Sequence, residues 1–187
     1  MSIFDRPKGD KTQRFEAQIL PHLDAAYRFA RWLSQSPSDA DDIVQETMLR
    51  AFRALDSLKG DDAKVWLLTI VRNCHRSAFS QQLRRASVSL PDEATDQEEF
   101  TIAATDTPEA QAIAADTGRA LDRLMAALPE EYREVLILRE LEDMSYRDIA
   151  TMMNTPIGTV MSRLARARLA LREQWQDRYA GDAHALR

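Results

Sequence analysis

Residues 145–172 read SYRDIATMMNTPIGTVMSRLARARLALR, and this stretch decides the fold of the C-terminal part of the chain. Ser145 is a candidate N-cap for a short helix, and Asp148 lies three residues later, in the position of a capping-box partner. Asn154 falls at a tight turn that needs a left-handed backbone, which Asn tolerates well. A Thr N-cap then precedes Pro156, the expected first residue of a second helix. The spacing predicts a helix-turn-helix.

The second predicted helix has two different sides. Its inward side is apolar and consists of Val160, Leu164, Ala167 and Leu171. Its outward side carries Thr159, Ser162, Ala165 and Arg166, with Met161 and Arg163 at the edges. Small or polar residues followed by arginines allow a helix to approach the major groove closely. A solvated cationic face is the alternative interpretation, but the turn chemistry beside it favours DNA binding.

The net charge of −5 is unusual for a DNA-binding protein until it is divided along the 187 residues. Eight acidic residues and no basic ones lie between residues 91 and 117, whereas the flanking parts are neutral or basic. Helical periodicity also fades in this acidic stretch, and Asp, Glu, Thr and Ala dominate it. Such a composition is typical of a solvated, flexible linker between domains.

Apolar residues repeat with helical spacing on both sides of the acidic stretch, and no alternating strand pattern of useful length occurs. The expected helices span residues 15–34 with a break or start near Pro21, a segment capped by Ser38, a segment beginning near Ala63, residues 117–128, residues 130–141, and two short helices before a polar tail at 179–187. The predicted fold is therefore all-α. It has two small helical domains, residues 10–90 and 118–178, joined by the acidic linker 91–117.

Several functional classes are excluded by what the sequence lacks. The longest apolar run, residues 65–71, is too short to span a bilayer, and the first thirteen residues show no secretory signal. Cys74 is the only cysteine, so it forms no internal disulfide. No Ser-His-Asp, P-loop or glycine-rich nucleotide motif occurs. We therefore expect a cytoplasmic protein without membrane insertion, enzymatic activity or cofactor.

Two features of the N-terminal half have competing interpretations. Asp41, Asp42 and Glu46 form a carboxylate cluster, but no His or Cys lies nearby, so a charged helix start is preferred to a metal site. Cys74 shares an apolar stripe with Trp66 and Ile70, which predicts a buried small side chain rather than a redox sensor.

Three segments, in this order, resemble the extracytoplasmic-function (ECF) sigma factors, the small members of the sigma-70 family. Residues 39–55, DADDIVQETMLRAFRAL, are similar to the helix that docks on the β′ clamp helices of RNA polymerase. Residues 63–85 are similar to the segment that reads and melts the −10 element. Residues 129–173 are similar to the domain that reads the −35 element. The resemblance covers residues 12–178.

The resemblance implies a sigma-2-like bundle and a sigma-4-like helix-turn-helix that bind core RNA polymerase, through the β′ clamp helices and the β flap, and promoter DNA. It also implies control by an anti-sigma factor. For the −35 element it implies base contacts by Met161, Ser162, Ala165 and Arg166, and phosphate contacts or helix support by Thr159, Arg163 and Arg168. For the −10 strand it implies Arg72, Asn73 and Arg76, with the loop from Lys59 to Lys64 as a pocket for a flipped-out base. For polymerase docking it implies Asp41, Asp42, Gln45 and Glu46.

Two other functions remain compatible with the residues. A stand-alone helix-turn-helix regulator would be a stable dimer on a palindromic site and would not bind polymerase. A protein that imitates a sigma factor and sequesters its anti-sigma factor would keep the docking helices and lose promoter binding. The intact recognition helix, with its arginines, argues against this second alternative.

Overall fold

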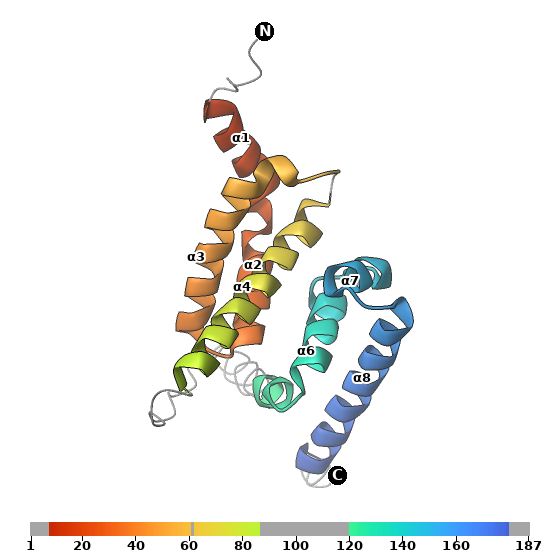
Figure 1. Cartoon of the computed structure of the whole chain (residues 1–187). Helices are drawn as coiled ribbons and strands as arrows, with labels where there is room; N and C mark the ends of the chain where they lie inside the picture. The colour runs from red at the N-terminus through yellow and green to blue at the C-terminus, as the bar shows by residue number, and fades with distance from the viewer. Residues whose placement is uncertain (1–7, 61, 87–119, 180–187) are drawn as a thin grey trace, which may run out of the picture. The chain divides into compact units, whose positions relative to one another are not determined.

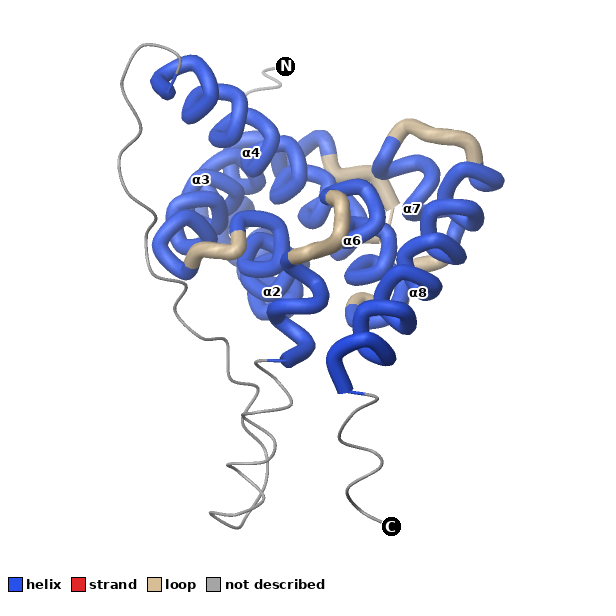
Figure 2. Tube along the Cα trace, turned by 90° about the horizontal axis from the view of Figure 1, so that it is seen from below, coloured by secondary structure: helices blue, strands red, loops and turns tan. Residues whose placement is uncertain are grey.

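The computed structural model describes residues 8–60, 62–86 and 120–179, and all regular structure in these ranges is helical (Figures 1 and 2). The prediction of an all-α protein is confirmed. The chain divides into two compact units, residues 1–95 and 96–187. The predicted acidic linker, 91–117, lies outside the described residues, so its boundaries stay a prediction. No described helix combines the length and the apolarity needed to cross a membrane.

The N-terminal unit is built on three helices that pack pairwise around one core (Figure 1). Its elements are α1 (Lys8–Gln18), η1 (Leu20–His22), α2 (Leu23–Ser34), α3 (Pro37–Ala54), η2 (Leu55–Ser57) and α4 (Ala63–Ala86). Phe29 of α2, Leu55 at the end of α3, and Leu67, Leu68 and Val71 of α4 are fully buried. Burying these large side chains supplies the main stabilisation of the bundle.

The start of α3 differs from the prediction. The N-cap is Ser36 and not Ser38, because Ser36 Oγ accepts a hydrogen bond from the backbone N–H of Asp39 at 3.3 Å. Pro37 follows as the first helical residue, where its fixed φ suits the helix and its missing N–H costs nothing. The predicted break near Pro21 is confirmed, since Pro21 lies in η1 between α1 and α2.

The first helix begins at Lys8, seven residues before the predicted start at residue 15. Charged contacts attach it to η2, directly after α3: Arg14 Nη1 lies 3.1 Å from Asp56 Oδ1, and Lys11 Nζ lies 3.5 Å from Asp56 Oδ2. The hydrogen bond from Arg14 and the charge of Lys11 lower the pKa of Asp56. Phe15 also packs edge-to-face on Phe52. Apolar periodicity does not detect a helix that is held mainly in this way.

The C-terminal unit contains a helix at residues 120–126, α6 (Glu130–Leu136), a π-helical turn η3 (Ile137–Leu141), α7 (Tyr146–Met153) and α8 (Ile157–Tyr179). Val135, Ile137 and Ile149 are fully buried in its core, where α6 and α7 both pack on α8. The prediction of two short final helices is wrong for the second one. After residue 172, α8 continues because no glycine or proline interrupts it before Gly181.

A buried arginine joins helix 120–126 to α6. Arg133 of α6 is only 6% exposed. Its guanidinium donates hydrogen bonds to the carbonyl oxygens of Met125 at 3.0 Å, Ala126 at 3.3 Å and Leu128 at 2.9 Å. These carbonyls lie at the end of helix 120–126, where a helix lacks internal partners. Burial lowers the pKa of Arg133, against the opposing charges of the neighbouring glutamates, but a guanidinium remains protonated in proteins.

Replacing Arg133 with Met should destabilise the C-terminal unit by about 3 kcal/mol, because three buried carbonyls lose a charged donor. Arg133→Lys should recover part of this loss, since an ammonium still donates but cannot span all three oxygens. Thermal unfolding of the full chain, followed by calorimetry, measures the difference. A melting temperature of Arg133→Met equal to that of the wild type would contradict the assignment.

Candidate nucleic-acid interface

The first helix of the predicted helix-turn-helix is capped as the sequence indicates. Ser145 Oγ accepts a hydrogen bond from the backbone N–H of Asp148 at 3.1 Å and donates one to Asp148 Oδ2 at 2.5 Å. At the other end of α7, Asn154 adopts the left-handed conformation, with φ 50° and ψ 52°. The N–H of Thr155 then donates to the carbonyl oxygen of Ala150 at 3.0 Å. The Ser145 N-cap and the Asn154 turn are confirmed, whereas the Asp148 carboxylate bonds the Ser145 hydroxyl and not the backbone N–H that a full capping box uses.

The second helix begins one residue later than predicted. The regular structure of α8 starts at Ile157, and the carbonyl oxygen of Pro156 is its first acceptor, receiving the N–H of Val160 at 3.2 Å. Pro156 therefore occupies the cap position that the sequence analysis assigned to Thr155. Although the helix starts one residue later, its inward and outward sides consist of the predicted residues, because the spacing from the turn to the inward residues is unchanged.

The inward side of α8 is buried at Val160, Leu164 and Ala167. The outward side presents to solvent all four residues that the resemblance assigns to base contacts: Met161, Ser162, Ala165 and Arg166. Thr159 is half-buried at the edge. In the described part of the chain Arg166 forms no ion pair, so its guanidinium is available to a phosphate or a base.

Two of the predicted arginines have protein partners instead. Arg163 Nη2 lies 2.6 Å from Glu131 Oε2 of α6, and Arg168 Nε lies 3.1 Å from Glu140 Oε1 of η3. The bond to Glu140 raises the pKa of Arg168. These pairs connect α8 to α6 and η3 of the same unit. They correspond to helix support, the second of the two roles that the resemblance allows for Arg163 and Arg168.

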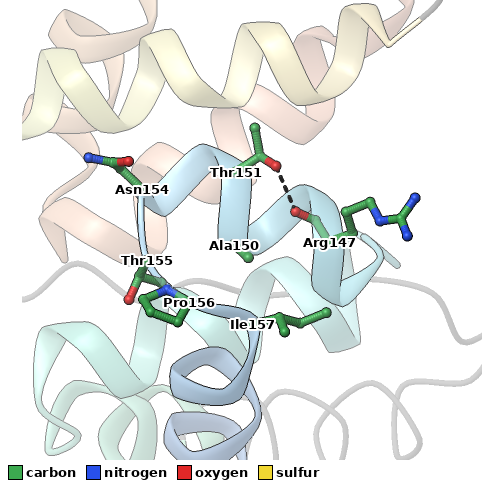
Figure 3. A pocket seen from close by; sticks show the side chains of 7 residues that line it. All are labelled: Arg147, Ala150, Thr151, Asn154, Thr155, Pro156 and Ile157. Carbon is green, nitrogen blue, oxygen red and sulfur yellow. Dashed lines mark hydrogen bonds between the residues drawn. The ribbon is translucent and has the colours of Figure 1, made fainter.

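An open hollow of about 570 Å³ lies between α7 and the start of α8 (Figure 3). Its lining consists of Arg147, Ala150, Thr151, Asn154, Thr155, Pro156 and Ile157. Arg147 is exposed and makes no ion pair with another described residue. Arg147 is not among the residues that the resemblance assigns to DNA. The inward positions of Ile149 and Met153 already place residue 147 on the outward side of α7.

The predicted docking residues lie together on the solvent side of α3. Asp41, Asp42 and Gln45 are exposed. Glu46 is partly exposed and pairs with Arg50, whose Nε lies 2.6 Å from Glu46 Oε1. Among the described residues, no three His, Cys, Asp or Glu side chains are grouped so that they hold a metal ion. The face is acidic and accessible, which suits contact with a basic partner surface.

The predicted −10 residues do not share one exposed side of α4. Asn73 and Arg76 are exposed, but Arg72 is only 7% exposed, so its placement beside them is wrong. The buried side of α4 is centred on Leu67, Leu68 and Val71 and is wide enough to include Arg72.

Other predicted features of α4 have mixed outcomes. Trp66 and Ile70, expected in the core, are half-buried at its edge, whereas Cys74 is buried as expected. Lys64 is half-buried at the start of the helix. The loop before it has Gly60 at φ 77°, and residue 61 lies outside the described residues.

Replacing Asn154 with Ala should destabilise the C-terminal unit by about 1 kcal/mol, because a β-carbon without a polar side chain is disfavoured at positive φ. Asn154→Gly should stay within about 0.5 kcal/mol of the wild type, since glycine adopts this conformation freely. Urea unfolding of the three full-length proteins, followed by circular dichroism, tests this order. Equal stability of the Ala and Gly variants would contradict it.

Comparison with known protein families gives two matches. The family model described as "Sigma-70 region 2" matches residues 19–85, and the one described as "Sigma-70, region 4" matches residues 118–171. The ECF RNA polymerase sigma-E factor of Haemophilus influenzae is 36% identical over 141 aligned positions, and the match covers 71% of this chain and 72% of that protein. The ECF RNA polymerase sigma-E factor of Escherichia coli K12 is 38% identical over 138 residues, with the same shares.

Solved structures give a similar result. The sigma factor RpoE of Bartonella quintana, crystallised in complex with the anti-sigma factor NepR, superimposes with a TM-score of 0.73 at 29% identity. The match covers 88% of this chain and 98% of that one. CnrH, solved with the cytosolic domain of CnrY, has a TM-score of 0.59 at 24% identity over 89% of this chain and 95% of that one, which supports the fold alone.

Proposed function

This chain belongs to the sigma-70 family as an ECF RNA polymerase sigma factor, and on that premise we propose that it binds core polymerase and directs it to promoters through α3, α4 and α8. One observation carries the proposal: a docking face on one unit and a helix-turn-helix on the other occur in the same chain. We do not retain the alternative of a stand-alone helix-turn-helix regulator. Such a protein would not need an N-terminal unit of the sigma-70 region 2 family, which this chain has.

For the −35 element, we assign base contacts to the outward side of α8, at Met161, Ser162, Ala165 and Arg166. An arginine at this position suits bidentate contact with guanine, and apolar side chains suit the methyl group of thymine. Thr159 is placed at the edge of this surface, beside a phosphate. Arg163 and Arg168 act first through their glutamate partners, so their contribution to phosphate binding competes with those ion pairs.

We add Arg147 to the DNA-binding residues. Its position beside the hollow, on the helix that precedes the recognition helix, corresponds to the part of a helix-turn-helix that crosses the DNA backbone. Its guanidinium is exposed and carries no ion pair with a described residue, so it binds a phosphate without losing a protein partner. Such contacts position the domain and depend strongly on salt.

The N-terminal unit supplies the other two functions in this proposal. Asp41, Asp42, Gln45 and Glu46 form the surface for the β′ clamp helices. Asn73 and Arg76, with Lys64 at the start of α4, contact the −10 strand. We leave Arg72 out of the proposed direct contacts because its side chain is buried. The C-terminal unit contacts the β flap.

We also propose control by an anti-sigma factor, supported by the structural likeness to RpoE of Bartonella quintana in its complex with NepR. A sigma factor selects promoters and does not catalyse RNA synthesis, so we expect no catalytic activity and no cofactor. We place its action in the cytoplasm, where the polymerase and the chromosome are.

Two variants separate the proposed roles. Arg166→Ala should lower promoter-specific run-off transcription by about tenfold or more with unchanged affinity for core polymerase, because a base contact is lost. Asp42→Arg together with Glu46→Arg should weaken core binding instead, through reversed charge. Run-off transcription on genomic fragments with core polymerase identifies a dependent promoter, and binding of labelled protein measures core affinity. Equal loss of both functions in either variant would count against the assignment.

The phosphate contact of Arg147 has a separate signature. Arg147→Ala should weaken binding of the holoenzyme to that promoter and lower the slope of log K against log salt by about 1, because one fewer counterion is released. Arg123→Ala serves as the control, since Arg123 is also exposed but lies in helix 120–126, outside the helix-turn-helix. If both variants had the wild-type slope, Arg147 would not contact a phosphate.

A further inference from the structure

Gly158 lies in the first turn of α8, and the fold does not explain why it is a glycine. Its φ is not positive, in contrast to that of Gly60 at 77°, so the backbone there accepts any L-residue. A β-carbon built on Gly158 has no other atom within 4 Å. Neither backbone conformation nor packing within the described chain requires the missing side chain.

Glycine also has a cost at this position. Within a helix it is less stable than alanine, because the unfolded chain loses more conformational freedom on folding. The described structure therefore gives no reason within the protein for a glycine at this position. Close approach of the main chain to a ligand is one of the established uses of glycine.

The position of Gly158 indicates the ligand. Helical spacing places it on the same side as Ser162, four residues later, and Ala165, seven residues later. This side is opposite to the buried row that contains Val160 and Leu164. Ser162 Oγ donates to the carbonyl oxygen of Thr159 at 3.0 Å, so this hydroxyl is turned back onto its own helix. The main chain at Gly158 is therefore accessible on the side assigned to DNA.

We propose that Gly158 is a positioning residue, which allows the −35 duplex to make van der Waals contact with the main chain of α8. The inference rests on the proposed function of this helix. A helix with its side chains is about 10–12 Å wide and the major groove is about 12 Å wide, so little clearance remains. One added carbon extends the surface by about 1.5 Å, the length of a C–C bond.

The displacement affects residues further along the helix. Hydrogen bonds from Arg166 to base edges require donor–acceptor distances of about 2.7–3.2 Å. A helix moved outward by a methyl group at its first turn no longer meets that condition. Gly158 thus acts on specificity through the residues that follow it, without reading a base itself.

The test is a size series at position 158 in the full chain. Gly158→Ala should raise the melting temperature by roughly 2–6 °C, because alanine favours the helix. The same substitution should weaken promoter binding by the holoenzyme about tenfold or more, which is the size of one lost base contact. Gly158→Val should weaken binding further, and affinity for core polymerase should stay unchanged in both variants.

The control is Gln176→Ala, in the exposed last part of α8. It changes helix propensity without adding a side chain at the first turn. This variant should bind the promoter as tightly as the wild type. A Gly158→Ala variant that binds the promoter as tightly as the wild type overturns the proposal, and so does one that melts at a lower temperature. A wild-type chain without promoter-specific run-off overturns the proposed function together with this inference. Normal wild-type run-off with normal Gly158→Ala binding overturns only the role of Gly158.

Discussion

In the C-terminal unit, the carbonyl groups at a buried helix end need hydrogen-bond donors, because the helix itself supplies none there. Helix 120–126 ends inside the unit, and the guanidinium of Arg133 supplies donors to three of those oxygens. A single side chain of α6 therefore ties this helix to the end of helix 120–126. Because α6 in turn packs on α8, this buried polar contact contributes to the position of α8.

Sequence reasoning found the elements that bury an apolar stripe or contain distinctive turn chemistry. The helix-turn-helix belongs to the second kind, since Ser145 and Asn154 each allow few conformations. The early start of α1 was not predicted, because ion pairs to Asp56 leave no periodic pattern of apolar residues in the sequence. The burial of Arg72 escaped it as well, since a charged residue is assigned to the surface unless a partner in space is known.

The sequence predicted which residues of α8 lie on its outward side, but not which of its arginines form ion pairs within the protein. The spacing of Met161, Ser162 and Arg166 already placed them on the side opposite the core. Which arginines remain available to DNA depends on neighbours far away in sequence, at Glu131 and Glu140. Arg147 lies outside the recognition helix, and in the described structure no acidic side chain pairs with it. Its exposure could therefore not be separated from that of Arg163 and Arg168 by sequence alone.

The two glutamates that hold Arg163 and Arg168 have an evolutionary consequence. They lie on α6 and η3, away from the outward side of α8, yet they pair with two of its arginines. In the proposed interface, genetic drift at either acidic position would release an arginine for the DNA backbone without altering any residue of α8 itself. Divergence of regulons between related sigma factors therefore has a route through residues that an inspection of the DNA-reading face would overlook.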